Sequence, residues 1–124
     1  MSLAEYFANV EGVGVLGTAD AEGKVDLALY ARPHVLDEDT VAFIMGDHLS
    51  HDNLASNPHA AYLFVERGET YNGLRMYLTR TGEETDPQKV EAMRRRSHGE
   101  HDYTGMKKYL VQFQVDEVRR LVGQ

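Results

Sequence analysis

The chain has no cysteine and no tryptophan, and its acidic residues outnumber its basic ones. Without cysteine it cannot form a disulfide, a cysteine-ligated zinc site or a thiol nucleophile. Aromatic residues make up only 9%, which does not favour a large stacking surface. The formal net charge of −7 argues against a general nucleic-acid binder, which would carry a basic face. A small anionic ligand remains compatible, because charges more than roughly 10 Å away are screened.

Signals for export, membrane insertion and hydrolysis are also missing. The first residues, MSLAEYFANVEG, lack a basic region followed by a long apolar run, so no signal peptide is expected. No segment approaches the ~20 apolar residues that span a membrane. We find no Ser-His-Asp arrangement, paired carboxylates on one element or Walker-type phosphate loop. The sequence predicts a cytoplasmic protein with one domain over residues 1–124.

Short strands and a few helices are predicted along the chain. Ser2 and Glu5 match a capping box that starts a helix, and Asp86-Pro87 starts another. A short helix from Ser50 to Ser56 is expected to end at Asn57-Pro58. The expected strands are GVLGTAD, VDLALYARPHVLD, TVAFIMGD, AAYLFVE, LRMYLTRTGEE and KKYLVQFQVDEVRRLVG. Six strands with few helices predict a mainly β protein with flanking helices, built as a small barrel or strongly curled antiparallel sheet.

The second expected strand is amphipathic and contains a proline. Leu27, Leu29, Ala31, Pro33 and Val35 fall on one face, while the other face carries Asp26, Ala28, Tyr30, Arg32 and His34. Because proline cannot donate to a ladder, we expect a bulge or an edge at that point. Arg32 is interpreted either as a surface salt-bridge partner or as a donor to a bound anion.

The strongest candidate site lies where TVAFIMGD passes into the helix that begins near Ser50. The first four N–H groups of a helix have no partner within it. Ser50 is expected to cap this helix, and capping is compatible with phosphate binding because both use these N–H groups. His48 and His51 could instead join Asp47 or Asp52 at a metal, but no metal site is assigned. The His98–Asp102 cluster is interpreted as a polar loop.

In these segments the chain resembles the FMN-binding split-barrel family, which includes pyridoxamine phosphate oxidases and small FMN-binding proteins. The resemblance covers residues 13–122 and rests on VDLALYARPHVL, TVAFIMGD and HLSHDNLASNPHAAYLF. In the last of these, Asn53-Leu54 and Asn57-Pro58 match the family pattern. The resemblance implies a six-stranded antiparallel split β-barrel and a homodimer with FMN at the subunit interface.

The resemblance also implies which residues contact the cofactor. Ser50 and His51 would approach the phosphate, with His48 nearby. Many relatives carry Lys or Arg where this chain has Leu49 and Ser50, so Arg32 or the partner subunit's Arg75 would supply the missing charge. The implied cofactor-binding set is Tyr30, Ala31, Arg32, Pro33, Met45, Gly46, His48, Leu49, Ser50, His51, Asn53 and Arg75.

By this resemblance the chain is an FMN-dependent oxidoreductase acting on an unidentified small molecule. The ending VRRLVGQ lacks the Arg-Trp of true pyridoxamine phosphate oxidases, so that activity is not expected. Two alternatives stay open: a non-catalytic FMN-binding or electron-transfer module, and a split-barrel protein that binds haem through His34, His48 or His51. No catalytic residue is assigned.

Overall fold

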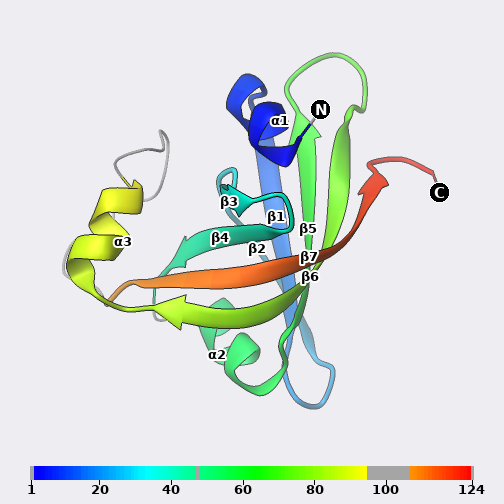
Figure 1. Ribbon diagram of the computed structural model, residues 1–124. Coiled ribbons are helices and arrows are strands. Elements are labelled where there is room, and N and C mark those ends of the chain that lie inside the picture. The colour runs from blue at the N-terminus through cyan, green and yellow to red at the C-terminus, as the bar shows by residue number, and fades with distance from the viewer. Residues whose placement is uncertain (1, 47, 95–106, 124) are drawn as a thin grey trace.

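The computed structural model describes residues 2–46, 48–94 and 107–123. In these ranges the chain forms three short helices and seven strands (Figure 1). The helices are α1 (Leu3–Asn9), α2 (Leu49–Ser56) and α3 (Pro87–Arg94). The strands are β1 (Gly12–Ala19), β2 (Val25–Leu29), β3 (His34–Asp37), β4 (Thr40–Met45), β5 (His59–Glu66), β6 (Gly73–Glu84) and β7 (Tyr109–Arg120). They form one antiparallel sheet in the order β2-β1-β5-β6-β7-β4-β3.

The expectation of six strands is wrong, because the segment predicted as one strand from Val25 to Asp37 forms two. β2 pairs with β1 and β3 pairs with β4, so the two halves lie at opposite edges of the sheet. The apolar-polar alternation continues through residues 30–33, but the pairing partner changes there. Pro33 is buried in this interruption, where no ladder requires the N–H that it lacks.

The connection between β2 and β3 makes the sheet curl. The chain from Leu29 to His34 can span at most roughly 18 Å when fully extended. The two edge strands of a seven-stranded sheet must therefore approach each other, which closes the sheet into a barrel that is open along this connection. We call residues 30–33 the barrel break.

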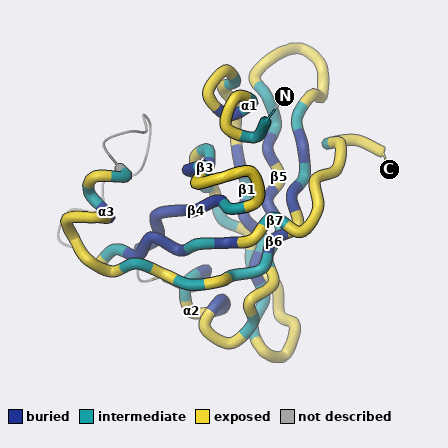
Figure 2. Tube along the Cα trace, viewed as in Figure 1, coloured by how far each residue is buried: buried dark blue, intermediate teal, exposed yellow. Residues whose placement is uncertain are grey.

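The core shows why TVAFIM is apolar at consecutive positions. β4 is buried along almost its whole length (Figure 2). Phe43 belongs to the main core inside the barrel, whereas Ala42 and Ile44 form a second cluster with Val90 of α3. The strand is covered on both faces, and a continuous hydrophobic run is typical of such strands.

The helices begin where the sequence predicts, with one shift. Ser2 and Glu5 form the complete capping box of α1, as expected. Before α3, the Asp86 carboxylate accepts the Gln88 N–H at 3.0 Å. α2 begins at Leu49, one residue earlier than expected. No helix in the described ranges is long and apolar enough to cross a membrane.

Candidate functional site

The N-terminus of α2 follows the buried end of β4 and has no side-chain cap. Met45 and Gly46 are buried, and the cap position is held by His48, whose side chain makes no capping hydrogen bond. The prediction that Ser50 is the cap is therefore wrong: Ser50 is the second residue of the helix. α1 and α3, by contrast, each have a side chain that accepts a first-turn N–H. The first-turn N–H groups of α2 can accordingly serve an anion.

Ser50 connects this turn to the barrel break. Its side chain is buried, at 3% exposure, and its hydroxyl lies beside the Tyr30 phenol. Burial raises the pKa of Tyr30, an effect that the neighbouring Ser50 hydroxyl opposes and the charge of Asp26 reinforces. The Tyr30 ring also packs edge-on against Phe43, with 5.8 Å between ring centres. The phenol is therefore protonated at neutral pH and held at the start of α2.

His51 is engaged by side chains from β6 and β7. Its ring stacks on Tyr109, with 3.7 Å between ring centres and 21° between planes. Its Nε2 lies 2.9 Å from Glu83 Oε1, and the imidazole is 16% exposed. Arg80 also donates to that carboxylate oxygen, at 3.1 Å. His51 thus ties α2 to the sheet instead of presenting an open ring to a ligand.

The link between His51 and Glu83 predicts a pH-dependent contribution to stability. Partial burial would raise the pKa of Glu83, but hydrogen bonds and charges from His51 and Arg80 outweigh it and hold this pKa below its ordinary value. A depressed carboxyl pKa stabilises the fold above the unfolded-state value, and this contribution disappears as pH falls through the folded-state pKa. We expect Glu83→Gln to cost about 0.5–1 kcal/mol of unfolding free energy at pH 7.

Urea unfolding of wild type and Glu83→Gln at several pH values measures this contribution. The difference between the two proteins should be constant down to roughly pH 5 and shrink toward pH 3. Glu69→Gln, at an exposed position in the β5–β6 loop, is the control and should show no such difference. An effect of Glu83→Gln that is the same at all pH values would contradict the assignment.

Asn53 and Leu49, two further residues of α2 that the sequence predicts to bind the cofactor, differ in how far they are buried. Asn53 is buried and donates from Nδ2 to Thr18 Oγ1 at 3.0 Å, which anchors α2 to β1. Leu49 is 55% exposed, and His48 is exposed beside it. Asn53 therefore positions the helix, while Leu49, His48 at the cap position and the acidic first-turn residue Asp52 are exposed.

The barrel break is held by hydrogen bonds from three directions. The Tyr30 N–H donates to the Gly14 carbonyl at 3.0 Å. The Tyr62 hydroxyl donates to the carbonyls of Tyr30 and Ala31, each at 3.1 Å. Arg32 Nη1 donates to the carbonyls of Phe7 at 3.0 Å and Val10 at 2.6 Å, at the C-terminal end of α1. Arg32 thus acts on a helix end, where a positive charge is favourable, and forms no salt bridge among the described residues.

Arg75 lies on the outward face of β6, opposite Leu63 of β5 and Arg119 of β7. Its Nε donates to the Arg120 carbonyl at 2.9 Å and its Nη2 to the Gly123 carbonyl at 2.8 Å. Both arginines named as sources of the missing charge therefore bind backbone carbonyls of their own chain.

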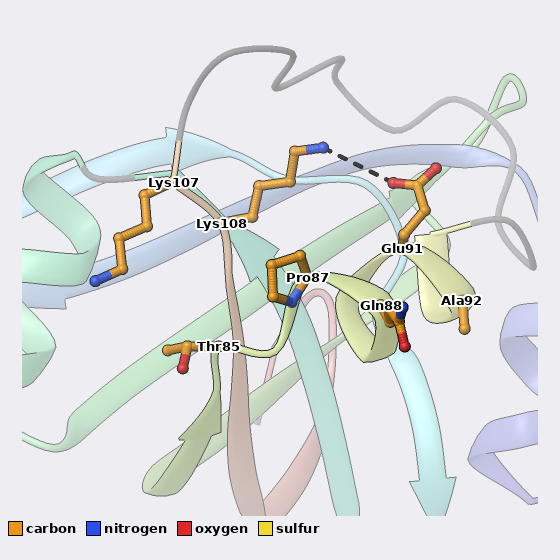
Figure 3. A pocket seen from close by; sticks show the side chains of 7 residues that line it. All are labelled: Thr85, Pro87, Gln88, Glu91, Ala92, Lys107 and Lys108. Carbon is orange, nitrogen blue, oxygen red and sulfur yellow. Dashed lines mark ion pairs between the residues drawn. The ribbon is translucent and has the colours of Figure 1, made fainter.

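A cavity of about 640 Å³ lies between α3 and the start of β7 (Figure 3). Lys108 pairs with Glu91 at 3.8 Å, whereas the Lys107 side chain points away from that pair. The Lys107 ammonium lies 5.3 Å from the centre of the Tyr109 ring, the same ring that stacks on His51. Lys107 therefore places a positive charge one aromatic ring from the first turn of α2. The residues that line the cavity are Thr85, Pro87, Gln88, Glu91, Ala92, Lys107 and Lys108.

Sequence reasoning missed Glu83, Lys107 and Tyr109. Glu83 lies on β6, Tyr109 begins β7 and Lys107 shortly precedes it, so all three are distant in sequence from α2, and no local pattern marks them. Within the described ranges no group of three or more metal-ligating side chains occurs. Asp47 and the His98–Asp102 cluster lie outside the described residues.

The outward face of β2, β1 and β5 is apolar and exposed. Val25 and Leu29 are each 75% exposed, and Leu27 is 72% exposed. The strand register continues this surface across the sheet, from Leu27 over Gly17 to Ala61. We call it the apolar face, consisting of Val13, Val15, Gly17, Val25, Leu27, Leu29, Ala61 and Leu63. Contiguous exposed apolar surface of this kind marks an interaction site.

Comparison with known proteins identifies the fold. Neither a protein-family model nor a curated protein matches the sequence. This chain is similar to an FMN-binding protein from Syntrophomonas wolfei (TM-score 0.77, 15% identity, covering 95% of this chain and 82% of the other). It is also similar to HutZ, a haem storage protein from Vibrio cholerae (0.70, 16%, 97% and 96%). A third match is an F420 reductase (0.69, 14%, 92% and 94%).

Candidate pyridoxamine 5'-phosphate oxidases are also among the matching structures. The matches thus include both redox enzymes and a haem storage protein, so the fold does not decide whether this chain is an enzyme. At these low identities the similarity establishes architecture and no more. The chain has the split-barrel fold that FMN-binding, pyridoxamine-phosphate-oxidase-like and haem-binding proteins share.

Proposed function

We propose that this protein binds FMN, with the cofactor phosphate at the first turn of α2, and that it is an oxidoreductase acting on a small molecule. The observation that carries the proposal is the uncapped N-terminus of α2, which follows the buried end of β4 in a split-barrel fold. A helix start whose N–H groups lack a side-chain acceptor is suited to a phosphate. We also propose a cytoplasmic location, as the sequence predicts.

The donors around this turn fit a phosphate by hydrogen bonding more than by charge. Backbone N–H groups and the Ser50 hydroxyl are present, and the first turn carries no Lys or Arg. Lys107 lies on the other side of the Tyr109 ring, and no described carboxylate pairs with its ammonium group. The barrel break would contact the flavin, whose ring supplies the electron transfer once bound. The protein's own task is to bind and orient the cofactor.

We propose a homodimer that uses the apolar face, with FMN at the subunit boundary. A second copy is the fitting occupant, because the apolar face is flanked by charges of both signs, Arg75 and Arg119 beside Glu117. A twofold arrangement can then bring opposite charges together at the rim while the apolar rows meet.

Titration of purified protein with FMN, followed by flavin fluorescence, tests the proposed function. We expect a dissociation constant below about 10 μM, and Ser50→Ala should weaken binding by roughly 10- to 150-fold, since a hydrogen bond to a charged group contributes about 1.5–3 kcal/mol. Ser56→Ala is the matched control, because Ser56 lies at the opposite end of α2 and bonds only within it. Failure of the wild type to bind FMN would overturn the proposal.

Turnover separates the enzyme from a non-catalytic FMN-binding or electron-transfer module. The proposal expects NADH or NADPH to reduce the bound flavin with steady turnover, whereas the alternative module binds FMN and does not turn over. The similarity to HutZ supports haem as the alternative ligand, and His48 is exposed at the uncapped helix start. A Soret band after haemin addition, combined with no FMN binding, would favour that alternative.

A further inference from the structure

Tyr62 of β5 places a hydroxyl group in the barrel interior. The residue is 0% exposed, and its ring lies 4.9 Å from that of Phe43, centre to centre. Burying a hydroxyl without a hydrogen-bond partner is costly, so the partners of the Tyr62 hydroxyl indicate its structural role. Those bonds go to two consecutive carbonyls of the barrel break, those of Tyr30 and Ala31.

These carbonyls have lost the partners that a regular strand would supply. The ladder between β2 and β1 ends at the pair Leu29–Val15, and the ladder between β3 and β4 begins at His34–Ala42. The Tyr62 hydroxyl therefore replaces a neighbouring strand at the point where the chain crosses from one edge of the sheet to the other.

Gly14 provides the space for this contact. A Cβ atom at position 14 would lie 1.8 Å from the Tyr62 hydroxyl oxygen and 2.6 Å from the Tyr30 carbonyl oxygen. The Gly14 carbonyl in turn accepts the Tyr30 N–H. Gly14 and Tyr62 together fix the backbone of Tyr30 on both its N–H and its C=O side.

The same residue connects the break to α2. The Tyr30 ring packs against Phe43, which also contacts Tyr62, and the Tyr30 phenol lies beside Ser50 of α2. We propose that Tyr62 is a positioning residue of the cofactor site: its hydroxyl fixes the barrel break, and through Tyr30 it fixes the break relative to the first turn of α2. This inference rests on the proposed FMN binding, because the break and that turn are the two parts of the site.

Tyr62→Phe tests the inference, since it removes the hydroxyl and keeps the ring. We expect the variant to fold, to bind FMN at least about 10-fold more weakly and to shift the visible absorption maxima of the bound flavin. Tyr6→Phe is the matched control: its hydroxyl bonds to Glu66 at 2.6 Å, joining α1 to β5, and donates to neither the Tyr30 nor the Ala31 carbonyl. That variant should lose stability without a change in FMN affinity or spectrum.

A second measurement does not depend on the cofactor. Hydrogen exchange at the Tyr30 amide should be faster in Tyr62→Phe than in wild type, and unchanged in Tyr6→Phe. If wild type binds FMN and Tyr62→Phe binds it equally with the same spectrum, the inference is overturned. If wild type does not bind FMN, the proposed function is overturned. If, in addition, hydrogen exchange at the Tyr30 amide is unchanged in Tyr62→Phe, the positioning role of Tyr62 is overturned as well.

Discussion

Leu27→Lys is expected to convert the protein from a dimer into a monomer at micromolar concentration. Leu27 is 72% exposed in the single chain and lies beside Gly17 on the apolar face. Burying a leucine side chain contributes about 1.5–3 kcal/mol, and a twofold interface loses that contribution twice. A lysine there also brings two desolvated charges into the contact. We expect the dimer dissociation constant to rise by roughly 10²–10⁴-fold.

Light scattering after size-exclusion chromatography measures the change. Leu36→Lys is the matched control, because Leu36 lies on β3 at the opposite edge of the sheet and is 38% exposed. It should remain dimeric. FMN affinity should fall in the monomeric variant, since the proposed site lies at the subunit boundary. A wild-type protein that is already monomeric would contradict both the interface and the placement of the cofactor.

The elements that the sequence predicts correctly have local causes. The Ser2–Glu5 capping box and the Asp86-Pro87 start are complete within a few residues, and they form as expected. The alternation in LRMYLTRTGEE likewise places Leu74, Met76 and Leu78 in the core. The split of the Val25–Asp37 segment has a cause that no local pattern contains, because it depends on β3 pairing with β4 while β2 pairs with β1.

At the candidate site, too, local sequence patterns do not contain the contacts between distant residues. The position of the anion-binding turn follows from a strand that ends before a short helix, and the structure has that turn. The expectations for individual side chains depended on partners that lie far away in sequence. Arg32 bonds to the end of α1, His51 to Glu83 of β6, and Arg75 to the C-terminal segment. Those contacts form only after the barrel closes.

Gly14→Ala adds one methyl group and is expected to lower the stability of the protein far more than Gly82→Ala, the other glycine-to-alanine change. The new Cβ would lie 1.8 Å from the Tyr62 hydroxyl oxygen, 2.4 Å from its Cζ and 2.6 Å from the Tyr30 carbonyl oxygen. Tyr62 cannot move aside, because its ring is fully buried against Phe43. Overpacking of a core costs about 1–3 kcal/mol, and loss of the Tyr62 hydrogen bond to the break adds about 0.5–1.5 kcal/mol.

We therefore expect Gly14→Ala to lower the unfolding free energy by roughly 1.5–4.5 kcal/mol, which is a large part of the total for a domain of this size. Urea denaturation monitored by circular dichroism measures the loss. Gly82→Ala on β6 is the matched control: the nearest atom to its Cβ is Gln112 Oε1 at 3.7 Å, an ordinary contact. Its midpoint should change little, because nothing has to move. Equal midpoints for the two variants would mean that the barrel break can yield, and that Tyr62 and Gly14 do not fix it.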